Sequence, residues 1–83
     1  MTVTVNKDLY NFFEELNNTQ LMKGKISAIV LDECRIELYF TYEVFSRISN
    51  ENSRTYKKFK KILDKYDLEY DLIKYRCFEV CKK

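Results

Sequence analysis

The positively charged side chains between residues 54 and 65 are the part of the sequence best suited to chemistry, and that chemistry is the binding of anions. Six of these twelve residues are Lys or Arg. In an α-helix, their spacing produces a row of charge about 16 Å long, which can contact several phosphates or an acidic protein surface. Because lysine is also common on the solvent side of helices, a surface without a partner is the alternative. The candidate binding residues are Arg54, Lys57, Lys58, Lys61 and Lys65.

Catalytic motifs are absent from the sequence. The chain has no His and one Gly, so it contains neither a glycine-rich phosphate loop nor a nucleophile beside a recognisable base. Asp67, Glu69 and Asp71 share one face of a predicted strand, where carboxylates are usually solvated or paired with lysines. We therefore predict that the protein is not an enzyme.

The three cysteines do not suggest a metal site or a disulfide. Cys34, Cys77 and Cys81 include no CxxC spacing, and no His is present to complete a zinc site. Cys77 and Cys81 lie four residues apart in a predicted strand, a separation of about 13 Å that no disulfide spans. We expect reduced thiols, no bound metal and no cofactor.

Length and composition indicate a single folded domain at residues 1–83. A chain of 83 residues suffices for one small domain, and contents of 46% hydrophobic and 34% charged residues argue against disorder. The apolar runs are too short to cross a membrane, and the N-terminus lacks the pattern of a signal peptide. A cytoplasmic protein with no membrane partner is expected.

The first half of the chain predicts a short strand, a helix and a hairpin. Residues 2–5 alternate and are β-branched, which favours a strand. Asn6 can cap a helix over 7–17, whose apolar residues recur with helical spacing. Residues 25–31 and 34–42 predict two strands that turn near Asp32 and Glu33.

The second half predicts the basic helix and a final strand. The polar segment 49–53 interrupts a first helical turn at 44–48, and Ser53 can cap the helix at 54–66. From residue 67 the period changes to two, and the alternation slips near Leu72 and Ile73. Because no Gly or Asn is available for a turn there, we predict one long terminal strand with a bulge.

The predicted order of strand, helix, strand, strand, helix, strand resembles the ferredoxin-like βαββαβ arrangement. This resemblance implies an α+β domain in which two helices cover one face of an antiparallel sheet. It also implies a central position for the strand at 2–5. Without that strand, the expected arrangement is αββαβ.

The open face of such a sheet is a second candidate surface. The RNA-recognition motif, which is ferredoxin-like, has a glycine-containing aromatic signature on its third strand, whereas the corresponding segment CRIELYFTY has no Gly. Only Arg35 and Tyr39 resemble its base-stacking platform. Together with Arg76 and Phe78, they would form a surface rich in Arg and aromatic residues, as protein interfaces often are.

These observations predict a small non-catalytic binding protein. Residues with A/T-rich codons (Phe, Tyr, Met, Ile, Asn and Lys) number 38, and those with G/C-rich codons (Gly, Ala, Arg and Pro) number 6. This bias is typical of accessory proteins of phages, viruses or mobile elements, so we expect a factor that binds and inhibits a host protein or nucleoprotein complex. The alternatives are an RNA- or single-strand-DNA-binding module acting through helix 54–66, and a self-assembling protein, such as a homodimer through a strand edge.

Overall fold

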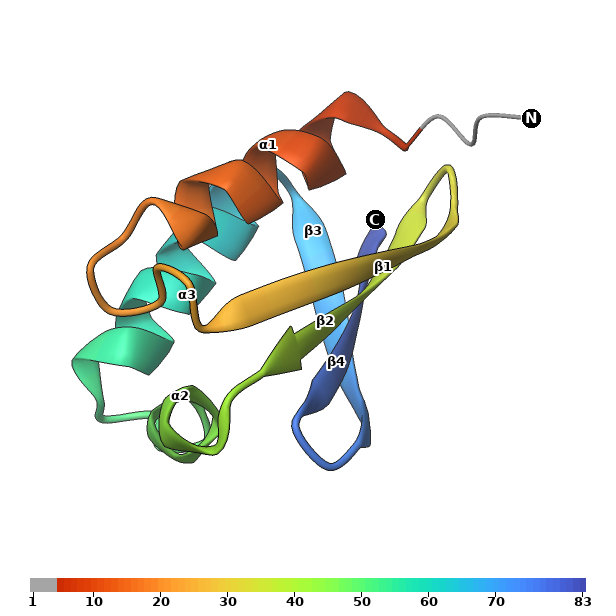
Figure 1. The fold of residues 1–83 in the computed structure, drawn as a ribbon. Helices are drawn as coiled ribbons and strands as arrows, with labels where there is room; N and C mark the ends of the chain where they lie inside the picture. Colours follow the sequence, from red (N-terminus) through yellow and green to blue (C-terminus); the bar gives the residue numbers. More distant parts are fainter. Residues whose placement is uncertain (1–4) are drawn as a thin grey trace.

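The chain forms a four-stranded antiparallel sheet with helices packed on one face (Figure 1). The computed structural model describes residues 5–83. Three helices and four strands make up this small α+β domain, in the order α1 (Lys7–Asn17), β1 (Ile26–Asp32), β2 (Arg35–Phe40), α2 (Tyr42–Ile48), α3 (Arg54–Lys65), β3 (Leu68–Lys74) and β4 (Cys77–Lys82). The longest of these helices has 12 residues, fewer than the roughly 20 needed to span a bilayer.

Two hairpins lie side by side to form the sheet. β1 pairs with β2, β3 pairs with β4, and β2 and β4 pair with each other in the centre, all antiparallel. The strand order is therefore β1-β2-β4-β3, which leaves β1 and β3 at the two edges (Figure 1).

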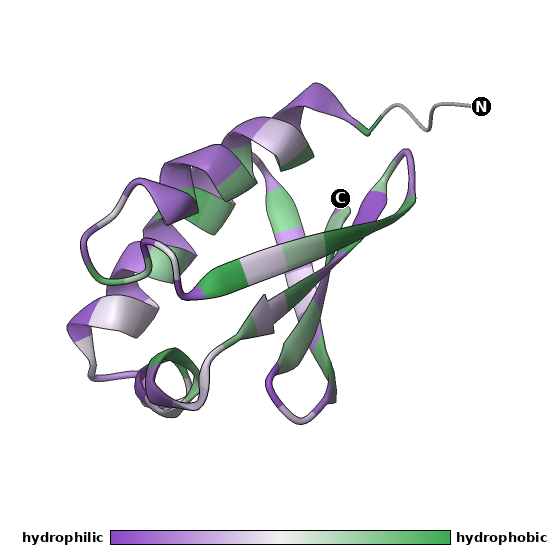
Figure 2. Ribbon diagram, viewed as in Figure 1, coloured by the Kyte–Doolittle hydropathy of each residue, from purple (hydrophilic) through white to green (hydrophobic). Residues whose placement is uncertain are grey.

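An aromatic cluster joins the sheet to the helices. The rings of Phe40 on β2 and Phe78 on β4 have centroids 5.0 Å apart, and Phe59 on α3 lies 5.7 Å from Phe78. All three side chains are buried. Phe40 and Phe78 meet edge to face, and contacts of this kind add to the free energy gained by burying the rings. Figure 2 shows the corresponding pattern, with hydrophobic residues on the strands and hydrophilic residues along much of the helices.

The start of α1 is fixed in two ways. The side chain of Asn6 accepts a hydrogen bond of 2.8 Å from the backbone N–H of Asp8, which caps the helix as the sequence predicts. The backbone N–H of Asn6 donates to the carbonyl oxygen of Glu33 at 2.7 Å. Because Glu33 lies in the turn between β1 and β2, α1 begins beside the end of β1.

The sequence correctly predicted the α+β class, the helix at 7–17, the first hairpin and the basic helix. The predicted single terminal strand is wrong, because residues 68–82 form the β3–β4 hairpin. Its turn is Tyr75 and Arg76, and Arg76 adopts a φ of 62° in place of the glycine expected in such a turn. The predicted irregularity is present, since the pairing register shifts between Leu72 and Lys74.

The arrangement of elements differs from the ferredoxin-like order. Residues 42–48 form a separate helix, α2, so three helices are present instead of the two expected. The central strands are β2 and β4. The strand predicted at residues 2–5 lies outside the described residues except for Val5, which precedes α1 without belonging to a strand.

Candidate functional site

Helix α3 presents the main candidate surface. The hydroxyl of Ser53 accepts a hydrogen bond of 3.0 Å from the backbone N–H of Tyr56 and caps the helix. One side of α3 is fixed in the core by four buried residues, which are Thr55, Phe59, Ile62 and Leu63. Because a helix turns about 100° per residue, this packing directs the opposite side to solvent.

Five cations lie on that solvent side. Arg54, Lys57, Lys58, Lys61 and Lys65 are all exposed, as the helical spacing predicts, and we call this set the α3 cation row. Lys60, the sixth cation of the helix, lies outside the row, and its ammonium group is 3.1 Å from Asp64 Oδ1. The charge of Lys60 is thus balanced within α3.

A carboxylate from α1 meets the C-terminal end of the row. Lys65 Nζ lies 2.6 Å from Glu15 Oε1. This hydrogen bond lowers the pKa of Glu15 below its ordinary value and raises the pKa of Lys65 above its own. Lys58 also lies close enough to favour the charged form of Glu15. The row is therefore partly neutralised at Lys65 and strongest from Arg54 to Lys61.

The cation row lines a shallow groove between α3 and α1. One hollow of about 500 Å³ is bounded by Arg54 and Lys58 on one side and by Glu15 and the loop 18–21 on the other. A second hollow of about 340 Å³ is lined by Lys58, Lys61 and Lys65, again with Glu15. Because both hollows are lined by Glu15 and Lys58, they adjoin each other along α3, and we call the two together the α1–α3 groove.

The four residues predicted to share the open sheet face do not come together. Phe78 was assigned to the wrong face: it is only 6% exposed and packs in the aromatic core, because the β4 register turns Phe78 and Val80 toward the helices. Arg35 lies on the open face, but its Nε is 2.8 Å from Asp32 Oδ2. Tyr39 and Arg76 line a hollow of about 290 Å³ at the other end of β2.

The open face is acidic at its centre. Glu37 on β2 lies opposite Glu79 on β4, and Glu79 lies opposite Asp71 on β3. These three carboxylates form a row across the strands, where like charges repel each other and any approaching phosphate. Arg35 lies 3.9 Å from Glu79, and Lys74 lies 4.0 Å from Glu37. The open face thus carries charges of both signs, whereas the α3 cation row lies on the helical side.

No metal or thiol chemistry stands out within residues 5–83. In this part of the chain, no group of three or more His, Cys, Asp or Glu side chains could hold a metal ion. The thiol of Cys77 is buried, which raises its pKa. Cys34 and Cys77, like Cys81, are unbridged.

The sequence predicted the cation row but missed the other wall of the groove. Glu15 and the polar side chains of Asn18 and Gln20 come from α1 and the loop after it. Their polar character is visible in the sequence, but their position beside a helix that begins only at Arg54 depends on how α1 packs against α3. No protein-family model, curated protein or solved structure shows a significant match to the chain.

Proposed function

We propose that the protein is a non-catalytic binding module whose α3 cation row contacts the sugar–phosphate backbone of a nucleic acid. The observation that carries this proposal is the exposure of five cations on one side of α3, four of which line the α1–α3 groove. Four of them recur over eleven residues, a distance of about 16 Å, which matches two or three phosphates of an extended strand.

The remaining surface supports the same assignment. Arg35 and Lys74 balance only part of the carboxylate row on the open face, so a polyanion is attracted less to that face than to the α3 cation row. With Phe78 buried in the core, the open face lacks an aromatic residue that was expected to anchor a partner. Contacts made only through Lys and Arg to phosphates read no base sequence, so we expect weak sequence preference.

A salt titration tests this function. Purified protein is titrated into fluorescently labelled single-stranded RNA and DNA at several salt concentrations. If the three groove cations outside the Glu15 ion pair, Arg54, Lys58 and Lys61, contact phosphates of a single strand, the association constant should fall roughly 20-fold between about 50 and 200 mM salt. Binding that is absent at low salt, or that does not change with salt, would reject the proposal.

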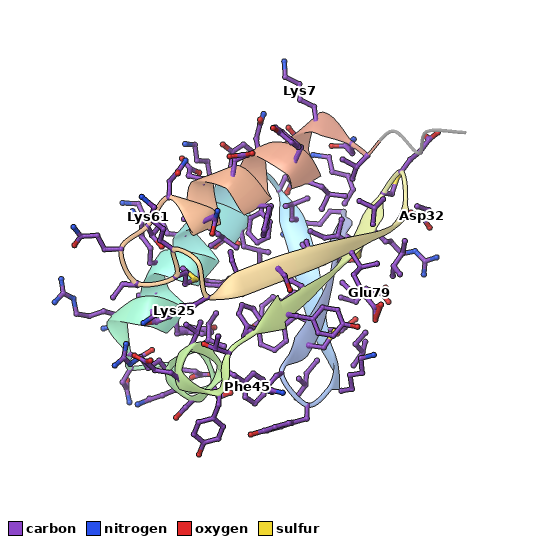
Figure 3. All side chains as sticks on the ribbon, in the orientation of Figure 1. Lys7, Lys25, Asp32, Phe45, Lys61 and Glu79 are labelled. Atoms are coloured by element: carbon purple, nitrogen blue, oxygen red, sulfur yellow. The ribbon has the colours of Figure 1, made fainter. Side chains whose placement is uncertain are left out.

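A matched pair of variants locates the contact. Lys58→Glu with Lys61→Glu reverses two charges in the groove, whereas Lys7→Glu with Lys23→Glu changes the net charge equally on exposed residues that do not line it. Figure 3 shows Lys61 and Lys7 at separate places on the surface. Only the first pair should abolish binding. Equal losses from both pairs would mean that net charge, and not the α3 cation row, determines affinity.

An acidic protein surface is the second candidate partner, and the Glu15–Lys65 ion pair favours it. A groove with a carboxylate among its cations repels phosphate locally, but it suits a protein partner with side chains of both signs. Failure to bind RNA and DNA would support this alternative if the protein still binds an acidic peptide that also contains lysines and the Lys58 and Lys61 reversal abolishes that binding. Inhibition of a host complex and an origin in a phage, virus or mobile element stay predictions from composition.

A further inference from the structure

Edge strand β1 has the features of a pairing site. Within residues 5–83, no strand pairs with the edge of β1 that faces away from β2. The backbone N–H of Thr41 donates to the carbonyl oxygen of Lys25, which makes Lys25 and Thr41 a hydrogen-bonded pair. Because such pairs alternate along an antiparallel ladder, the backbone groups of Ile26, Ala28 and Val30 point to the free edge.

The side chains of β1 do nothing to block another strand. Ile26 to Leu31 are all uncharged, and Ile29, Val30 and Leu31 are 53%, 44% and 40% exposed. By contrast, the other edge strand, β3, carries charges at Glu69, Asp71 and Lys74. Natural sheets protect their edges with such charges, so the two edges of this sheet differ in kind: β3 is protected and β1 is not.

An apolar groove extends the exposed edge. It has a volume of about 170 Å³ and is lined by Leu9, Tyr10 and Phe13 from α1 and by Ala28 and Val30 from β1. Tyr10, which lines this groove, is 56% exposed. A strand that paired with β1 would therefore also cover apolar side chains that the single chain leaves in water.

We propose that the partner of β1 is β1 of a second copy of this chain, paired antiparallel about a two-fold axis at Ala28. In this register Ala28 faces Ala28 of the other copy, and Ile26 faces Val30. All three residues whose backbone groups point outward then form hydrogen-bonded pairs, and the pairing ends before the irregularity between Val30 and Asp32. The strand is thus complementary to itself, as a two-fold interface requires.

The dimer would have a continuous eight-stranded sheet. Because the two-fold axis between antiparallel strands is perpendicular to the sheet, the helices of both copies lie on the same side. The groove side chains Tyr10 and Phe13 of each copy then approach Val30 or Ile26 of the other, which extends both cores across the axis. The two α3 cation rows also face the same side and can bind one polyanion together.

Sedimentation and matched variants test the dimer. The wild-type chain should dimerise at micromolar to tens of micromolar concentrations, and Val30→Lys, which would bury a charge in the interface opposite Ile26 of the other copy, should weaken dimerisation at least tenfold. Leu72→Lys makes the same change at a helix-side position of edge strand β3, where Leu72 is 61% exposed, and should leave the dimer intact. Circular dichroism and thermal unfolding establish that both variants fold.

A cross-linking experiment tests the register, and it does not depend on whether the chain still folds with a lysine at position 30. In a background with Cys34→Ser and Cys81→Ser, Ala28→Cys should give a covalent dimer on mild oxidation, since hydrogen-bonded pairs have Cα atoms about 5.5 Å apart. Ile29→Cys should not, because its two copies would be more than about 7 Å apart. The opposite result would overturn the proposed register.

Other outcomes would overturn the proposal as a whole. A chain that stays monomeric at several hundred micromolar has no β1 dimer. If removal of residues 1–4 from such a monomer produced a dimer, the edge would be covered by the chain's own N-terminal segment. A dimer that Leu72→Lys disrupts and Val30→Lys does not would place the interface on β3.

Discussion

The ammonium group of Lys65 on α3 lies 2.6 Å from Oε1 of Glu15 on α1, a residue 50 positions earlier in the chain. This ion pair lies in the α1–α3 groove and places a negative charge beside the α3 cation row. Lys65 therefore has two competing partners, the carboxylate of its own chain and the anion that we propose the row binds. Because Glu15 pairs with Lys65 but repels an anion, its substitution should lower the stability of the fold slightly and strengthen nucleic-acid binding.

We predict that Glu15→Gln strengthens nucleic-acid binding. The substitution keeps the size of the side chain but removes the charge that neutralises Lys65, so one more cation becomes available to phosphate. The association constant should rise about two- to fivefold at moderate salt, and the salt dependence should steepen by nearly one cation. Fluorescence anisotropy titrations of wild type and variant measure both. Unchanged or weaker binding would show that Lys65 does not contact the ligand.

The same ion pair predicts a pH window for stability. The pKa of Glu15 is lowered in the folded chain from its ordinary 4.5, so its contribution is present above pH 4.5 and is lost as the pH falls through the folded pKa. The pKa of Lys65 is raised above 10.5, so its contribution is present below pH 10.5 and is lost as the pH rises through the folded pKa.

Urea unfolding of wild type and Glu15→Gln at acidic, neutral and strongly alkaline pH measures this window. The free energy of unfolding should differ most between the two proteins near neutral pH, and the difference should shrink at about pH 3 and about pH 12. The difference will be small, because both side chains are partly exposed to solvent. A difference that is constant across this range would mean that the ion pair does not stabilise the fold.

Phe78 illustrates how the sequence prediction of the open face failed. With a single terminal strand, nothing fixed which of its two faces was buried, and Phe78 was placed with Arg76 outside the core. The hairpin turn at Tyr75 and Arg76 sets the register of β4 against β2, in which Phe78 pairs with the buried Leu38. A shift by one residue exchanges the two faces of a strand. Because the turn was not predicted, Phe78 was assigned to the wrong face.

We predict that Phe78→Leu destabilises the protein by about 1–2 kcal/mol, because it removes ring contacts with Phe40 and Phe59 and leaves a small void. Nucleic-acid binding by the folded variant should not change. Tyr39→Leu on the open face serves as the control and should have a smaller effect on unfolding. Thermal and urea unfolding provide the comparison. A stable Phe78→Leu protein would indicate that Phe78 does not lie in the core.

The helices, by contrast, could be predicted from sequence because their signals are local. The cap at Ser53 and the helical spacing of Phe59, Ile62 and Leu63 lie within one segment and determine which side of α3 is exposed. The groove that the cations line could not be predicted, because it depends on Glu15 and on loop 18–21 from the other end of the chain. Local periodicity defines a face, whereas the opposite wall of a site comes from tertiary packing.

The β3–β4 turn, which could not be predicted from the sequence, has a strained backbone at Arg76. Arg76 has a φ of 62°, a left-handed conformation that costs about 1–2 kcal/mol for a residue with a Cβ atom, whereas glycine adopts it without strain but loses roughly 0.5–1 kcal/mol more backbone entropy on folding. Its guanidinium group lies 5.5 Å from the centre of the exposed ring of Tyr75, a contact too exposed to offset that cost fully. Arg76→Gly should therefore stabilise the protein by about 0.5–1 kcal/mol, and Arg76→Ala, which keeps the Cβ atom and loses the same contact, should not. Urea unfolding of the two variants separates these effects, and equal stabilities would show that the turn is not strained.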